Sequence, residues 1–184
     1  MPSAADLFSN SKINLENEIE LIKSSSIISQ VIKNLNLNVS IFSVGEIRKS
    51  RVLNYPFDLI TKFNTDTTSN KSYKILIDDD KLKIVNIKTK QEYSFNSLTS
   101  KDVKHDLPFD IINIKKEKWL DNSYNLNFTS SHDLINSLKK NIVVTQIGKN
   151  SDIINLNFKA TKSLYARNVL NEIINVFNND GIED

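Results

Sequence analysis

Helical patterns stand at both ends of this chain with a strand-rich segment between them, which restricts the fold to helices laid on a sheet. Near the start, apolar residues recur at helical intervals, at positions 15, 19 and 22 and again at 28, 31, 32 and 35. Asn14 suits the N-cap, and the serines of Ser24–Ser26 weaken the helix between the two groups. The pattern predicts one kinked helix or two short ones, with Ser26 as the cap of the second.

The other helical pattern runs from Ser163 to Asn178. Its apolar residues form one face with two flanking members: Ala166, Leu170, Ile173 and Phe177, then Val169 and Ile174. Such a stripe is more typical of a helix packed on a core than of a partner surface. We expect both terminal helices to pack on the same side of a sheet, with the ends of the chain close together.

Short runs of alternating or continuous apolar residues predict strands in the remainder of the chain. These runs are 56–63, 73–77, 82–87, 93–95, 109–114, 124–128, 142–147 and 153–158. Asp78–Asp80 is interpreted as a hairpin turn, because it lacks the glycine and final glutamate of a calcium loop. A helix is expected over 131–140 with a capping box of Ser130 and Asp133, and residues 39–42 are interpreted as the entry to a loop.

Together these elements predict an α+β fold in which a mixed or antiparallel sheet packs against the N-terminal and C-terminal helices. The chain has 184 residues, which is enough to bury a sizeable core. A single domain over residues 1–184 is the simplest organisation.

Composition argues against several classes of function. The chain has 24 Lys and Arg against 22 Asp and Glu, whereas nucleic-acid binders concentrate basic residues on one face, so no nucleic-acid partner is expected. The basic run Lys115–Lys118 is interrupted by Glu117 and is interpreted as solvated surface. Without cysteine the chain can form neither a disulfide framework nor a thiolate metal site. No apolar run approaches the roughly 18–20 residues that span a bilayer.

Residues that could carry chemistry form no recognisable catalytic or cofactor pattern. The three glycines are too far apart for a phosphate loop or a dinucleotide fingerprint. His105 and His132 each precede an aspartate, but neither has a nucleophile or metal ligand at a known spacing, so structural or solvated roles are favoured. The sequence predicts a non-enzymatic domain with no catalytic residues, no cofactor and no metal.

Two blocks of sequence, one at each end, resemble a single family. The first is Asn17–Ser24, which reads Asn-Glu-Ile-Glu-Leu-Ile-Lys-Ser, followed by matches within 35–42 and at 55–57. The second is the strand at 153–158 and a helix that carries the family's alanine, leucine and asparagine: Ala166, Leu170, Asn171, then residues 179–184. In this order the blocks resemble the extracytoplasmic domain of polysaccharide chain-length determinants (Wzz-type polysaccharide co-polymerases, some fused to a Wzc-type tyrosine autokinase). Ser163 replaces a frequent proline, and the strand that precedes the head helix is missing.

The resemblance implies a non-enzymatic scaffold on the periplasmic face of the bacterial inner membrane. It would regulate chain length or export in capsular, exopolysaccharide or O-antigen (lipopolysaccharide) biosynthesis. Because family members have a transmembrane helix on each side of this domain, the chain is expected to be an excised, soluble fragment without those helices or a kinase domain. The implied partners are further copies in a homo-oligomer, a membrane polysaccharide polymerase, an outer-membrane export channel and the polysaccharide chain. Glu18, Glu20 and Lys23 are the candidate contact between copies.

A free-standing carbohydrate-binding or protein-interaction module is the alternative. A carbohydrate module needs an exposed aromatic platform, and Trp119 with Tyr124 is the candidate pair in this sequence. The alternative therefore depends on whether these two rings face solvent.

Overall fold

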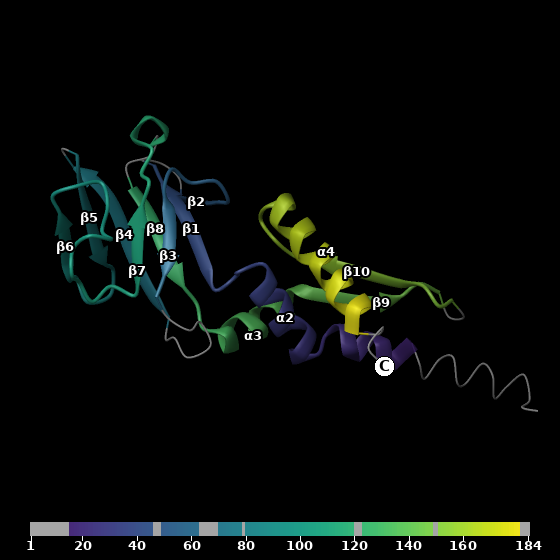
Figure 1. Ribbon diagram of the computed structural model, residues 1–184. Helices are drawn as coiled ribbons and strands as arrows, with labels where there is room; N and C mark the ends of the chain where they lie inside the picture. The colour runs from purple at the N-terminus through teal and green to yellow at the C-terminus, as the bar shows by residue number, and fades with distance from the viewer. Residues whose placement is uncertain are drawn as a thin grey trace, which may run out of the picture. The chain divides into compact units, whose positions relative to one another are not determined.

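A computed structural model describes residues 15–45, 49–62, 70–78, 80–119, 123–148 and 151–180. It confirms the α+β class, with antiparallel strands and with helices toward both ends of the chain (Figure 1). The sequence favours one domain, whereas the contacts of the chain gather into two compact units. We call Asn38–Ser131 the central unit, and the residues up to Leu37 and from His132 onward the terminal unit.

The central unit is built on a six-stranded sheet in which each neighbouring pair is antiparallel. In spatial order its strands are β2 (Lys49–Val52), β1 (Val39–Val44), β8 (Ser123–Phe128), β4 (Lys71–Asp78), β5 (Lys81–Asn86) and β6 (Glu92–Phe95). A two-stranded ladder joins β3 (Asp58–Thr61) to β7 (Phe109–Ile112), and the 3-10 helix η2 (Lys116–Lys118) follows β7. These strands confirm the predicted runs at 73–77, 82–87, 93–95, 109–114 and 124–128 and, over its described residues, the run at 56–63.

Alternation along β8 explains its place inside the sheet. Tyr124, Leu126 and Phe128 are buried, whereas Asn125 and Asn127 between them are only partly covered. A period of two directs the apolar side chains to one face of a strand. They join the core of the central unit, whose other buried members are Ile41, Phe57, Tyr73, Ile75, Leu82, Ile84, Phe95, Leu107, Phe109 and Ile111.

The described aspartates of the acidic run, Asp78 and Asp80, lie where β4 is followed by β5, in agreement with the predicted hairpin. Asp78 stands opposite Lys81 in the register of β4 and β5, and Asp80 has a φ of 63°. Aspartate enters this left-handed region more readily than most residues. The Lys116 ammonium forms an ion pair with the Asp80 carboxylate.

The terminal unit combines the first and last helices with a small antiparallel sheet. Residues 15–22 are helical, and α2 (Ser25–Asn34) follows directly after a break. Later in the chain come four elements: α3 (Ser131–Asn141, whose first residue belongs to the central unit), β9 (Ile142–Gln146), β10 (Ile154–Phe158) and α4 (Ser163–Asp180). β9 and β10 pair in register from Ile142 opposite Phe158 to Gln146 opposite Ile154.

Helices α2 and α4 pack against each other, and α4 also packs on β10 (Figure 1). Ile28 and Val31 of α2 and Val169 and Ile173 of α4 are each 0% exposed. The shared core is completed by residues of β9 and β10: Ile142, Val144, Ile154, Leu156 and Phe158. The two terminal helices therefore bury their apolar stripes together, over a sheet formed by β9 and β10.

The buried face of α4 is rotated from the predicted one. Val169, Ile173 and Val176 are buried, Leu170 is only partly buried, and Ile174 is 47% exposed. The buried positions follow the i, i+4, i+7 spacing of one helix face. The prediction placed Leu170 at the centre and Val169 at the edge, and this assignment is wrong.

The break between the first two helices is confirmed, but the cap is Ser24 rather than Ser26. Ser24 has extended backbone angles (φ −61°, ψ 154°), and its hydroxyl oxygen accepts a hydrogen bond from the Ile27 N–H at 3.2 Å. Ser26 lies inside α2 and is exposed. A cap needs this extended conformation and a free N–H three residues ahead, and both conditions are met at Ser24.

Residues 39–42 form part of β1 and do not enter a loop, and β2 was not predicted at all. β1 reads Val-Ser-Ile-Phe-Ser-Val, with serines that interrupt the apolar run, and β2 reads Lys-Ser-Arg-Val. Pairing with β8 on one side and β2 on the other holds β1 in the sheet. The expectation that the chain ends lie close together concerns residues 1–14 and 181–184, which are outside the described residues.

Candidate functional site

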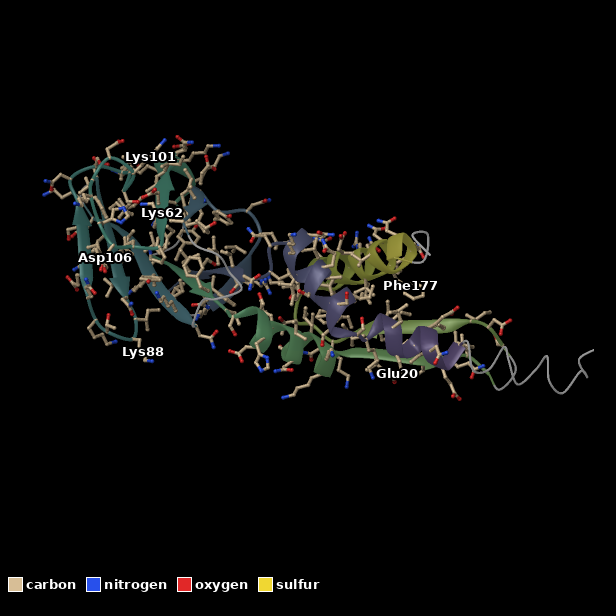
Figure 2. All side chains as sticks on the ribbon, turned by 60° about the horizontal axis from the view of Figure 1, so that its bottom comes forward. Glu20, Lys62, Lys88, Lys101, Asp106 and Phe177 are labelled. Carbon is tan, nitrogen blue, oxygen red and sulfur yellow. The ribbon has the colours of Figure 1, made fainter. Side chains whose placement is uncertain are left out.

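The candidate contact residues Glu18, Glu20 and Lys23 lie on and just after the helix at 15–22. Leu15 and Ile22 of this helix are buried, whereas Glu18 and Glu20 are exposed (Glu20 is marked in Figure 2). Lys23 is partly buried. Within the described part of the chain, neither glutamate takes part in an ion pair. The helix thus presents two unneutralised carboxylates at its surface.

Trp119 and Tyr124 are brought together as predicted, but they do not form an exposed platform. Their ring centroids lie 4.7 Å apart in an edge-to-face arrangement, and Tyr124 is only 4% exposed. Phe57 contacts both, at 6.0 Å from Trp119 and 5.6 Å from Tyr124. Because Tyr124 belongs to the inner face of β8, this pair extends the core of the central unit.

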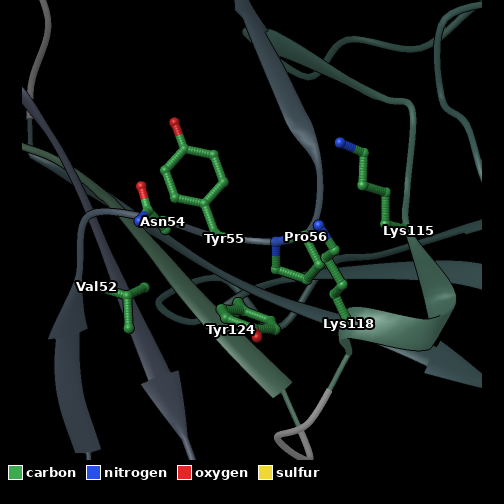
Figure 3. A pocket seen from close by; sticks show the side chains of 7 residues that line it. All are labelled: Val52, Asn54, Tyr55, Pro56, Lys115, Lys118 and Tyr124. Carbon is green, nitrogen blue, oxygen red and sulfur yellow. The ribbon is translucent and has the colours of Figure 1, made fainter.

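A partly open pocket lies beside this aromatic cluster (Figure 3). Its volume is about 410 Å³, within the range of small-ligand sites. It is lined by residues from four segments of the central unit: Val52, Asn54, Tyr55, Pro56, Lys115, Lys118 and Tyr124. The described residues thus form a concave site of a size that suits a small ligand.

Backbone hydrogen bonds fix the two walls of the pocket to each other. The Lys115 N–H donates to the Pro56 carbonyl at 2.7 Å, which continues the β3–β7 ladder beyond Asp58 and Ile112. Close by, the Asn113 amide donates to the Asp58 carboxylate at 2.8 Å. The segment before β3 and the segment after β7 therefore hold their positions without a ligand.

The electrostatic character of the pocket is positive. Lys115 and Lys118 are exposed, and neither forms an ion pair among the described residues. Among the described residues that line the pocket, none is acidic. Burial, and secondarily the charge of Asp58, raises the pKa of Tyr55, so its hydroxyl stays protonated at neutral pH and can donate a hydrogen bond.

Sequence reasoning missed this pocket. Lys115–Lys118 was interpreted as solvated surface, which agrees with the exposure of these lysines but not with the role of Lys115 and Lys118 as one wall. The signal in the sequence is weak: Asn54, Tyr55 and Pro56 form a turn-like tripeptide that carries an aromatic ring. Only the ladder between β3 and β7 brings this tripeptide to the lysines.

His105 has a structural role, in agreement with the interpretation of its sequence context. Its partner is Asp110 rather than the adjacent Asp106: Nε2 lies 3.0 Å from the Asp110 carboxylate and 3.0 Å from the Ser100 carbonyl. The Leu107 N–H donates to Nδ1, so the ring proton resides on Nε2. Lys62 also binds the Asp110 carboxylate, at 2.7 Å. These contacts fasten the loop before β7 to the strand.

His132 lies at the start of α3, where its Nε2 is 3.0 Å from the Asn136 amide nitrogen. Across the described ranges, no group of three or more His, Asp and Glu side chains could hold a metal ion. The pocket and the polar face of the first helix are candidate surfaces for binding.

Tyr93 provides a prediction about pH. Burial, a hydrogen bond to Asp106 and the charges of Asp106 and Tyr73 raise its pKa to about 12. Since the folded pKa exceeds the unfolded value of about 10, its contribution to stability is complete below pH 10 and is lost as pH rises through 12. We expect Asp106→Asn to lower the pKa of Tyr93. The pKa of Tyr93 is measured by ultraviolet titration of tyrosinate, after subtraction of the titration curve of a Tyr93→Phe variant. A pKa that Asp106→Asn leaves unchanged would exclude the Asp106 contact.

No protein-family model matches the sequence, and a search of curated proteins finds no significant match. Within the described ranges, no helix is both long and apolar enough to cross a membrane.

Proposed function

We propose that this chain is the extracytoplasmic scaffold domain of a polysaccharide chain-length determinant. The observation that carries the proposal is that the two sequence blocks of the resemblance fold into one unit. The first block, 17–24, continues into α2, and the second block comprises β10 and α4. These elements belong to the terminal unit, although they are separated along the chain by the central unit, which holds the further matches at 39–42 and 55–57.

Ile22 of the first block belongs to the same core as α4, and α2, which follows this block, packs on α4 through contacts that are specific as well as apolar. Ile28 and Val31 of α2 share a core with Val169 and Ile173 of α4. At the rim, the Asn34 amide donates to the Glu172 carboxylate at 2.7 Å. A family signature made of two distant blocks is expected when both blocks contribute to one packed surface, and this packing supplies the physical reason for the pairing.

In the proposed role the domain is a scaffold and carries no reaction of its own. Copies of the domain would form a ring through a head-to-tail contact that repeats around an axis, and the ring would limit the polymer made by a separate membrane polymerase. Export-linked relatives also engage an outer-membrane channel, which is a further proposed partner. Glu18, Glu20 and Lys23 are the proposed contribution of the first helix to the ring contact.

Assembly gives a prediction for the chain by itself. A modest polar interface associates weakly once the entropy of two rigid bodies is counted, and the membrane helices proposed for the longer protein are missing from residues 1–184. We expect the 184-residue chain to be a monomer or weak oligomer at micromolar concentration, and the longer anchored protein to be a higher-order oligomer in detergent. Light scattering measures the molar mass of the 184-residue chain and of the anchored protein. A stable ring formed by the chain alone, or a monomeric anchored protein, would contradict the prediction.

The ring contact can be tested within the anchored protein. Glu18→Lys with Glu20→Lys should reduce the fraction of higher-order oligomer, because both exposed carboxylates reverse their charge. Glu117→Lys, an exposed glutamate of η2, is the matched control and should leave assembly unchanged. Equal assembly of all three proteins would exclude this face of the helix from the contact. The proposed function itself is tested by the length of the polysaccharide in cells that lack the gene.

A further inference from the structure

We propose that the pocket of the central unit binds a sugar residue that carries a carboxylate, within an acidic saccharide. This goes beyond a scaffold role, and it rests on the pocket rather than on ring assembly. Three properties of the pocket lead to it: two lysines fixed on one side, an apolar ring face, and neutral hydrogen-bonding groups beside that face.

The first property is the position of the two ammonium groups. Lys115 is the N-cap residue of η2 and Lys118 its last residue, and Lys118 N–H donates to the Lys115 carbonyl at 3.0 Å. Residues three apart in a 3-10 helix project from the same side. In the view of Figure 3 the Lys118 side chain ends beside Pro56, and the Lys115 side chain points toward the upper left, above Pro56. Both charged residues of the described lining are lysines, so this wall favours an anion.

The neighbouring lysine does not take part. Lys116 is bound to the Asp80 carboxylate, and Glu117 is exposed and does not line the pocket. The Asp58 carboxylate, whose charge contributes to the raised pKa of Tyr55, accepts a hydrogen bond from the Asn113 side-chain amide. Among the described residues of the lining, Lys115 and Lys118 are therefore the charged groups that a ligand meets.

The second property is an apolar surface that remains accessible. Tyr55 is partly buried, and its ring packs 4.9 Å from that of Phe57, which fixes its orientation. Pro56 also lines the pocket but is buried, so Tyr55 provides the accessible part of this surface. The negative face of an aromatic ring attracts the weakly positive C–H groups of a pyranose. Tyr55 thus replaces Trp119 and Tyr124 as the ring that a sugar would contact.

The third property is a set of neutral polar groups at the edge of that surface. The Asn54 side chain is exposed and offers both a donor and an acceptor, and the Tyr55 hydroxyl remains protonated. A sugar ring needs this combination, since it has apolar faces and hydroxyl groups around its rim. A simple anion would use the lysines but not the tyrosine or the asparagine.

The test uses the trimer of α-1,4-linked galacturonic acid as the probe and its fully methyl-esterified form as the matched neutral ligand. Trp119 is the only tryptophan and packs on Tyr124 of the lining, so its fluorescence reports binding. We expect the acid to bind in the high micromolar to millimolar range and the ester to bind about tenfold more weakly, or about 1.4 kcal/mol. Added salt should weaken the binding of the acid.

Variants separate the contributions. The double variant Lys115→Gln, Lys118→Gln should lower the affinity for the acid at least to that for the ester. Tyr55→Ala should lower the affinity for both ligands. Lys88→Gln and Lys101→Gln, exposed lysines of the same unit outside the pocket (Figure 2), should leave binding unchanged. No binding of the acid, equal binding of acid and ester, or tighter binding of inorganic phosphate or of an acidic hexapeptide would overturn the proposal. Because this assay uses the purified chain, its failure is distinct from a failure of the proposed role in cells.

Discussion

Replacing Ile173 by alanine should lower the free energy of unfolding by about 2–5 kcal/mol. Ile173 is 0% exposed on α4 and belongs to the core that α4 shares with α2. The substitution removes buried methyl and methylene groups and leaves a cavity, because packed neighbours relax only partly. Urea denaturation followed by far-ultraviolet circular dichroism measures the loss, since the long helices of the chain belong to this unit.

Ile174→Ala is the matched control for this change. Ile174 is the next residue of the same helix and the same residue type, but its side chain is 47% exposed. Surface substitutions usually change stability by no more than about 0.5 kcal/mol. Equal losses at both positions would contradict the packing of α4 on α2.

Replacing Phe109 by alanine should cost about 3–5 kcal/mol in the central unit. Phe109 begins β7, is 0% exposed, and its ring lies 5.0 Å from that of Tyr73 and 5.5 Å from that of Phe128. The substitution therefore removes the ring that joins the β3–β7 ladder to strands β4 and β8 of the large sheet.

Trp119 fluorescence follows this second loss, because the single tryptophan belongs to the central unit. Ile60→Ala on β3 is the control: Ile60 stands opposite Asp110 in the same ladder but is 39% exposed. We expect the control to lose less than about 1 kcal/mol. A Phe109→Ala protein that unfolds at the same urea concentration as the unchanged chain would show that this ring is not part of the core.

Local patterns predicted the helices and most strands because they depend on neighbours in sequence. Apolar residues at helical intervals located α2 and α4, and alternation located β8. The positions of β1 and β2 depend on pairing instead: β1 lies between β2 and β8, and β8 is far away in sequence. The sequence Lys49–Val52 does not alternate between apolar and polar residues, so it has no local pattern that predicts a strand.

The division of the chain into two units could not be predicted for the same reason, because it depends on contacts between distant residues. Apolar periodicity shows which residues of a helix are buried, but not which other residues bury them. The contact of Val31 with the core around Ile173 and the contact of Tyr124 with the core around Phe57 belong to different clusters. Nothing in the local pattern separates these two cores.

The candidate pocket shows most clearly what local sequence patterns cannot predict. Asn54–Pro56 and Lys115–Lys118 each have an ordinary interpretation, as a turn and as a solvated basic run. The hydrogen bond from Lys115 to the Pro56 carbonyl and the register of β3 with β7 turn them into facing walls. Such a site arises from pairing between distant segments. The sequence shows each segment separately, but it does not predict that the two segments lie together.

The most direct test of the proposed role is the length distribution of the surface polysaccharide, separated by gel electrophoresis, in cells from which the gene is deleted and then restored. We predict that deletion leaves polymer synthesis active but broadens or shifts the lengths. The unchanged gene and the Ile174→Asp variant should restore the original distribution, whereas Ile173→Asp, which places a carboxylate in the core between α2 and α4, should not. An unchanged length distribution in the deletion strain would contradict a role in chain-length control.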